Sequence, residues 1–125
     1  VNTCSRSSWM SDDVYSAADF AIKYLEDHYV RDGLHHGADW RDTMEVFFRD
    51  KPLLTNNVLL YSTYRAKRGY QKAAAVYNAI ERTFWNGETY LDYPGATRFD
   101  PLGASLAVLH GIVPQERYGA ILAGF

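Results

Sequence analysis

Hydrophobic positions recur at helical spacing in the first third of the chain. Between residues 11 and 30, apolar side chains follow one another at intervals of three or four positions. Ser11 is a suitable N-cap, and Asp12 and Asp13 place negative charge where the helix dipole favours it. The segment ends at Arg31-Asp32-Gly33, in which the glycine suits a left-handed conformation. The pattern predicts one helix over about residues 11–30. Its apolar stripe comprises Val14, Ala17, Ala18, Ala21 and Leu25.

The helical pattern returns along the rest of the chain. Gly69 separates two adjacent periodic segments, and the second of them has the most regular amphipathic pattern. Pro101 and Pro114 stand where helices begin, because a missing N–H costs nothing in the first turn. The further predicted helices cover about residues 55–68, 70–85, 101–110 and 114–123.

These segments predict an all-α fold in which successive helices pair into hairpins. One longer loop separates the first two helices, and Thr89–Tyr93 is the one short piece with strand-like residues. A length of 125 residues fits a single domain. The paired-helix rhythm suggests a repeat, although identity between segments is too weak to define one.

The net charge and composition of the chain exclude some classes of binding partner. The net charge of -2 gives no general attraction to nucleic acid or to anionic membranes, and no apolar run approaches the ~20 residues that span a bilayer. A single cysteine, Cys4, excludes an internal disulfide and a cysteine metal cluster. We therefore expect a reducing, cytoplasmic location.

The sequence predicts neither a metal site nor a bound cofactor. His35 and His36 are adjacent, and adjacent residues rarely bind one ion. His28 and His110 stand alone in the sequence. The chain also lacks a glycine-rich phosphate loop and a Gly-x-Ser-x-Gly nucleophile motif.

The densest group of chemically active side chains is Asp39-Trp40-Arg41-Asp42, in the loop after the first helix. Carboxylates beside an indole suit a sugar-cleaving site, because an acid must protonate the glycosidic oxygen and an aromatic face can stack on the sugar. A solvated ion-pair loop with its tryptophan in the core is the other interpretation. These four residues alone leave both open.

Four motifs follow in order: Gly37–Asp42, Asn56–Ala66, Phe84–Asp92 and Thr97–Ala107. Together they resemble the six-hairpin glycosidases, the (α/α)6 toroids that include glycogen-debranching amylo-1,6-glucosidases, trehalases and neutral invertases. The first motif fits the Gly-x-x-Trp-x-Asp phrase that carries the general acid in debranching-type members. In the last, Asp100-Pro101-Leu102-Gly103 replaces the family's Arg-Pro-Asn-Gln phrase, so a debranching substrate is not implied.

The resemblance implies a role for each polar residue of the loop. Asp42 would be the general acid and Trp40 a platform for the sugar ring. The other expected substrate-binding residues are Asp39, Arg41, Asn56, Asn57 and Arg98. Structural roles remain open for the same residues. Trp40 would then be a core residue, Asp39 would cap a turn, and the two asparagines would be ordinary residues of a first helical turn. Asp100 fits a helix cap better than a pocket.

The implied reaction is the inverting hydrolysis of a glucoside or related oligosaccharide. A twelve-helix toroid needs roughly 190 residues at about 11–12 per helix and about 5 per connection. We therefore expect this chain to be part of a longer enzyme, inactive alone, with the catalytic base outside it. Exposed apolar helix faces would then favour self-association.

Two other functions remain open at this stage. A non-catalytic helical-hairpin module would bind a glycan or a peptide, fold alone and present polar outer surfaces. An enzyme homologue that had lost its activity would bind sugar only, and the sequence does not separate it from an active one.

Overall fold

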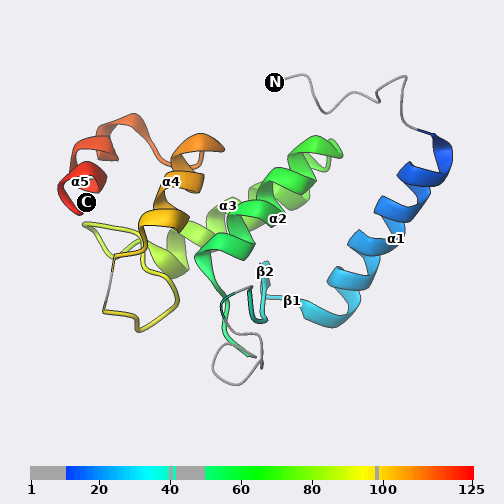
Figure 1. Ribbon diagram of the computed structural model, residues 1–125, viewed down its shortest axis with the longest axis horizontal. Helices are drawn as coiled ribbons and strands as arrows, with labels where there is room; N and C mark the ends of the chain where they lie inside the picture. The colour runs from blue at the N-terminus through cyan, green and yellow to red at the C-terminus, as the bar shows by residue number, and fades with distance from the viewer. Residues whose placement is uncertain (1–10, 40, 42–49, 98) are drawn as a thin grey trace.

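Two antiparallel helices, α2 (Leu54–Ala66) and α3 (Tyr70–Phe84), form the centre of the molecule (Figure 1). The computed structural model describes residues 11–39, 41, 50–97 and 99–125. The facing sides of α2 and α3 supply most of the hydrophobic core. Fully buried members are Leu54, Val58, Ala79, Ile80 and Phe84. The hairpin expected from the two central segments is therefore present, with helix ends within two residues of the predicted ones.

The turn between α2 and α3 has the hydrogen bonds of a Schellman motif. The N–H of Gly69 donates to the carbonyl of Tyr64 at 2.8 Å, and that of Arg68 donates to Arg65 at 3.0 Å. Arg68 has the left-handed backbone at φ 59°, whereas Gly69 has an ordinary φ of -82°. The left-handed position that follows α2 is thus occupied by Arg68, although glycine is the usual residue there.

Helix α1 (Asp12–Tyr29) lies beside this pair and contributes no buried residue. Ser11 caps it as predicted, with its side chain accepting from the N–H of Val14. The predicted stripe does not form one buried face. Ala18 and Leu25 are half-buried, whereas Val14, Ala17 and Ala21 are exposed. α1 therefore rests on its neighbours without entering the core.

A small β-hairpin follows α1, and it corrects the expectation that Arg31-Asp32-Gly33 simply ends a helix. Strands β1 (Val30–Arg31) and β2 (Leu34–His35) pair antiparallel across a two-residue turn. Asp32 and Gly33 both have positive φ, 56° and 80°. Two such residues are what a type I′ hairpin turn requires, so Gly33 is left-handed for the turn and not for a helix cap.

The C-terminal third contains α4 (Pro101–Leu109), a 3-10 turn η2 (Gln115–Arg117) and α5 (Tyr118–Ala123). The predicted fifth helix therefore begins as a 3-10 turn after Pro114. Asp100 caps α4 by accepting from the N–H of Gly103 at 3.0 Å. The strand-like piece Thr89–Tyr93 forms only single bridges in the structure, Trp85 with Tyr90 and Leu91 with Phe99.

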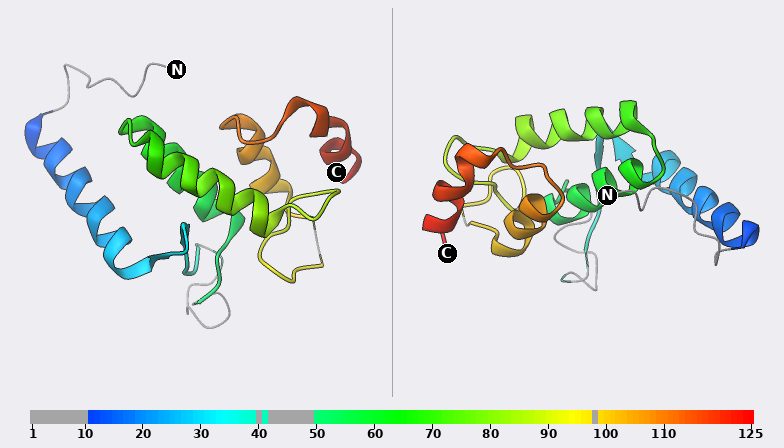
Figure 2. Two further views of the ribbon diagram at one scale, coloured as in Figure 1. Left: turned by 180° about the vertical axis from the view of Figure 1, so that it is seen from behind. Right: turned by 90° about the horizontal axis from the view of Figure 1, so that it is seen from above.

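The elements form an elongated row, with α1 at one end, α2 and α3 in the middle, and α4 and α5 at the other end (Figure 2). Helix dominates the described residues, as predicted, and the β1–β2 hairpin is the departure from an all-α fold. Among these residues no helix combines the length and apolar character needed to cross a membrane.

Candidate functional site

The predicted site lies in the loop after β2, beside the first turn of α2. Trp40, Asp42 and Arg98 lie outside the described residues, so three of the predicted site residues have no structural account here. Asp39 and Arg41 are described on either side of Trp40. The geometry of the loop is therefore known immediately before the predicted acid.

Arg41 lies between two carboxylates that come from distant parts of the chain. Its Nη1 and Nη2 donate to Asp92 at 2.8 and 2.9 Å, and its Nε donates to both oxygens of Asp39 at 3.0 and 2.9 Å. The Asp39 side chain is only 3% exposed and that of Asp92 is 17% exposed. Hydrogen bonds with Asp92, and then with Asp39, raise the pKa of the Arg41 guanidinium. This fork-like pairing is strong because it is bidentate and partly desolvated.

The ion-pair cluster of Asp39, Arg41 and Asp92 joins the described part of the loop to the segment between α3 and α4. The backbone N–H of Arg41 also donates to Asp39 Oδ1 at 2.9 Å. The backbone carbonyl of Asp92 accepts from the N–H of Leu54, the first residue of α2, at 2.9 Å. Asp92 therefore joins the loop to the start of α2.

Two neighbouring asparagines support the same loop from α2. Asn56 Nδ2 donates to the carbonyls of Gly37 and Ala38 at 3.2 and 3.3 Å. Asn57 accepts from the N–H of His35 at 2.7 Å and donates to the carbonyls of His35 and Leu53 at 3.0 and 2.9 Å. Asn57 is fully buried. Its position does not agree with direct substrate contact, because the amide is already used to hold β2 against α2.

His35 is the last residue of β2, and His36 follows it directly. His35 stacks on Tyr29 with 5.5 Å between ring centroids, and its buried Nδ1 has no hydrogen-bond partner. Burial lowers the pKa of both imidazoles. His36 Nδ1 lies 3.0 Å from the carbonyl of Leu34. Within the described residues no group of three histidine, cysteine or carboxylate side chains is placed to hold a metal ion.

Asp100 is a structural cap, as expected from the sequence. It is 7% exposed, and its buried Oδ2 has no hydrogen-bond partner among the described residues. A Cβ at position 103 would collide with this oxygen and with Leu54, so only glycine fits there. Burial raises the pKa of the Asp100 carboxyl group. The charges of Asp92, Arg41 and Asp39 also act on this carboxyl group, so Asp100 interacts electrostatically with the ion-pair cluster of the loop.

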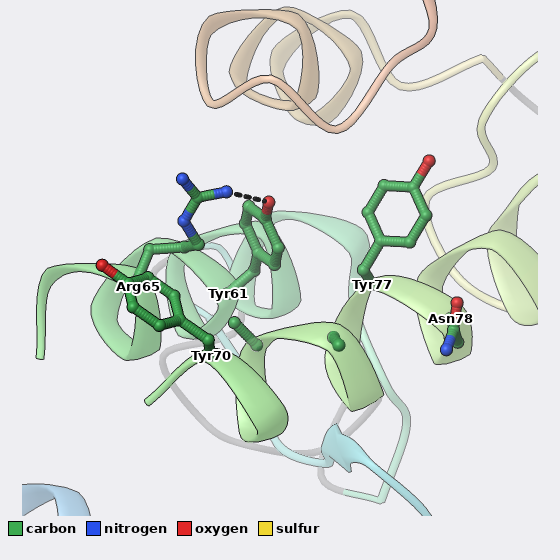
Figure 3. Close-up of a pocket in the computed structure, with 7 residues that line it drawn as sticks. Tyr61, Arg65, Tyr70, Tyr77 and Asn78 are labelled. Atoms are coloured by element: carbon green, nitrogen blue, oxygen red, sulfur yellow. Dashed lines mark hydrogen bonds between the residues drawn. The ribbon is translucent and has the colours of Figure 1, made fainter. Parts of the chain in front are cut away.

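A second candidate site, which the sequence patterns did not single out, is an aromatic pocket between α2 and α3 (Figure 3). It has a volume of about 260 Å³. Its lining comprises Tyr61, Arg65, Tyr70, Ala73, Ala74, Tyr77 and Asn78. The available signal was the spacing of tyrosines over two adjacent helices, but tyrosines are also common in cores. Which tyrosines face one another depends on how the two helices are rotated.

Comparison with known proteins adds no relative, since no family model, no curated protein and no solved structure matches the chain. Function therefore has to be argued from the loop and the pocket. The loop offers a rigid ion-pair cluster next to the predicted acid, and the pocket offers aromatic faces with polar edges.

Proposed function

We propose that this chain is part of an inverting glycoside hydrolase with a six-hairpin (α/α)6 fold, in which Asp42 is the general acid. The observation that carries the proposal is the charge of the neighbouring cluster. Asp39, Arg41 and Asp92 together have a formal charge of -1, because one guanidinium is shared by two carboxylates. A net negative neighbourhood raises the pKa of a nearby carboxyl group, as a general acid requires near neutral pH.

The pairing of Arg41 also weakens an argument against Asp42 as the general acid. An unshared guanidinium next in sequence would lower the pKa of Asp42 and keep it ionised. Two carboxylates already neutralise Arg41, which weakens that effect. In this proposal Trp40 stacks on the sugar ring, and Arg98 and Asn56 remain substrate-binding candidates. Asp39 and Arg41 act as positioning residues for the segment that leads into Asp42.

The second carboxylate of an inverting pair has to come from elsewhere. The reaction needs a base that activates water about 6.5–9.5 Å from the acid. Asp39 and Asp92 are engaged by Arg41, and Asp100 is buried under the α4 cap. None of these three is suited to that role. We propose that the base lies outside residues 1–125.

The apolar surface at both ends of the row supports membership in a larger helical assembly. Phe20 on α1 is 74% exposed, and Leu109 and Leu122, beyond the central pair, are 75% and 70% exposed. A self-contained helical module should present polar outer surfaces, because large exposed apolar groups favour association. Further helices, or a second copy of the chain, would cover these side chains.

The test is Asp42→Asn in the longest natural protein that contains this sequence. The wild type would be assayed on trehalose, sucrose, maltose and aryl rhamnosides, with NMR to follow the anomer released. We expect inversion, and a loss of about 10²–10⁴-fold in rate for the variant, the usual contribution of a general acid. Asp13→Asn, which alters an exposed carboxylate in the first turn of α1, is the control. Unchanged hydrolysis by the Asp42 variant would exclude the assignment.

A binding module without catalysis is the second candidate, and the aromatic pocket between α2 and α3 favours it. In that case the ion-pair cluster only stabilises a loop, and the ligand is a glycan or a peptide. Light scattering distinguishes the two candidate functions, because it measures whether exposed apolar surface makes the chain associate. A module is a monomer at all concentrations, whereas the exposed apolar faces of a partial toroid give concentration-dependent oligomers.

A further inference from the structure

The aromatic pocket lies apart from the 37–42 loop. Asn56, which contacts the loop, is in the first turn of α2, and Arg65 follows nine residues later. At 1.5 Å per residue Arg65 is about 14 Å from Asn56 along the helix, and Tyr61, the pocket residue nearest to the loop, is about 8 Å from it. The α3 side of the pocket runs from Tyr70 to Asn78, a length of about 12 Å. The pocket is therefore a separate site with room for a short ligand.

The inner part of the pocket is held in place by an arginine–tyrosine pair. Arg65 Nη1 donates to the hydroxyl of Tyr61 at 3.0 Å, as Figure 3 shows. The guanidinium also lies 5.8 Å from the ring centroids of both Tyr61 and Tyr70. Tyr61 is 7% exposed, so its ring belongs to the core as much as to the pocket. The pair fixes the orientation of the ring against which a ligand would lie.

The outer part of the pocket carries polar groups that are not used within the described structure. Tyr77 lies 6.2 Å from Tyr61 between ring centroids, at an angle of 48°. Its hydroxyl, the hydroxyl of Tyr70 and the amide of Asn78 make no hydrogen bond to any described residue. Tyr70 is 55% exposed. The rim thus combines flat aromatic faces with two hydroxyls and one amide, of which Tyr70 and Asn78 are exposed and Tyr77 is half-buried.

We propose that this pocket is a second carbohydrate-binding site, which takes one pyranose ring of the glycan. A pyranose has an apolar face for a tyrosine ring and hydroxyls at its edge for the tyrosine and asparagine groups. The ligand class rests on the proposed glycosidase function, and the pocket extends that function with a contact outside the 37–42 loop. A binding subsite at this distance would retain a polymeric or oligomeric substrate.

The test is a sugar titration of the longest natural protein that contains this sequence, in the Asp42→Asn form so that the probes are not hydrolysed, with saturation-transfer NMR and intrinsic fluorescence as the readouts. The probes are maltose, trehalose and sucrose. We expect dissociation constants on the order of 1 mM. Tyr70→Ala and Tyr77→Ala should each weaken binding about 3- to 10-fold, the range for losing one aromatic contact. Tyr77→Phe and Asn78→Ala test the polar edge without removing a ring.

Tyr118→Ala is the matched control, because Tyr118 is 38% exposed on α5 and does not line the pocket. Tyr61 is left intact, since its loss would disturb the core. The proposal is overturned if no probe binds, if the Tyr70 and Tyr77 variants bind as tightly as the wild type, or if a proline-rich peptide occupies the pocket in preference to the sugars.

The two proposals fail independently in these experiments. If Asp42→Asn leaves hydrolysis unchanged while the pocket variants lose sugar binding, the acid assignment is wrong and the pocket stands. If the Asp42 variant is inactive but sugar binding does not depend on Tyr70 or Tyr77, the pocket proposal is wrong and the acid assignment stands.

Discussion

Some buried polar side chains in this protein hold the segments that lead into the loop. Asn57 is the clearest example, because its one amide satisfies both the N–H and the carbonyl of His35 and ties them to α2. An unsatisfied buried amide would cost about 1–3 kcal/mol, so these bonds determine where β2 lies. Asp39 acts in the same way on Arg41. Residues chosen from sequence as ligand contacts can thus be loop supports.

His35 should make stability depend on pH in the acidic range. Its buried imidazole has a pKa below the ordinary 6.5, first because of burial and then because of His36. A group whose folded pKa is lowered contributes stability that is present above the unfolded pKa and lost as pH falls through the folded pKa. We therefore expect the free energy of unfolding, measured with urea, to fall progressively below about pH 6.5.

His35→Phe keeps the ring that stacks on Tyr29 and removes the titration. Its stability should fall less between pH 7.5 and pH 5 than that of the wild type. His36 is present in both proteins, so its contribution is common to both apart from its repulsion with His35, which belongs to the effect tested. An equal loss of stability in the two proteins would show that His35 does not carry the effect.

At the scale of the element, the end of α2 contains a strained residue. Arg68 has φ 59°, a left-handed conformation that costs a residue with a Cβ roughly 1–2 kcal/mol. Glycine adopts it without that cost but loses more conformational freedom on folding. Arg68→Gly should therefore raise the free energy of unfolding by about 0.5–1 kcal/mol, measured by urea denaturation.

The matched control for that prediction is Gly69→Ala. Gly69 has an ordinary φ, and a Cβ there would meet Tyr64 only at van der Waals distance. The two changes should act independently of each other on the backbone. A destabilised Arg68→Gly protein would mean that contacts of the arginine side chain outweigh the strain in its backbone.

The elements that could be predicted are those with local signals. Ser11 and Asp100 cap helices as their positions indicate, and Pro101 opens α4. The β-hairpin was missed although Asp32-Gly33 is a turn signal, because strands of two residues leave no periodic pattern. The pairing of Arg41 with Asp92 spans 51 residues and has no local signature at all. The candidate site is therefore indicated by motif alone, while the contacts that support its loop required the fold.

Across the whole molecule, α1 is attached differently from the other helices. It buries no residue completely, and polar links join it to the central pair. Asp19 pairs with Lys67 at 2.6 Å, and Glu26 accepts from Lys72 at 2.6 Å and from the hydroxyl of Tyr64 at 2.8 Å. The hydrogen bond with Lys72 is the main cause of a lowered pKa at Glu26. Ile22 adds a partial apolar contact.

Removing the Glu26 contact should therefore loosen α1 without unfolding the core. Most of the stability of a helix in a protein comes from its packing against other elements. The exchange rate of the amides in the 18-residue helix α1 therefore measures how firmly α1 is attached. In Glu26→Ala we expect amide hydrogen exchange across α1 to accelerate about two- to ten-fold, while α2 and α3 stay protected. The control is Asp27→Ala, because Asp27 is exposed and, among the described residues, pairs along α1 with Lys23 at 3.1 Å. Equal acceleration in both variants would mean that helix propensity, and not docking through Glu26, holds α1 in place.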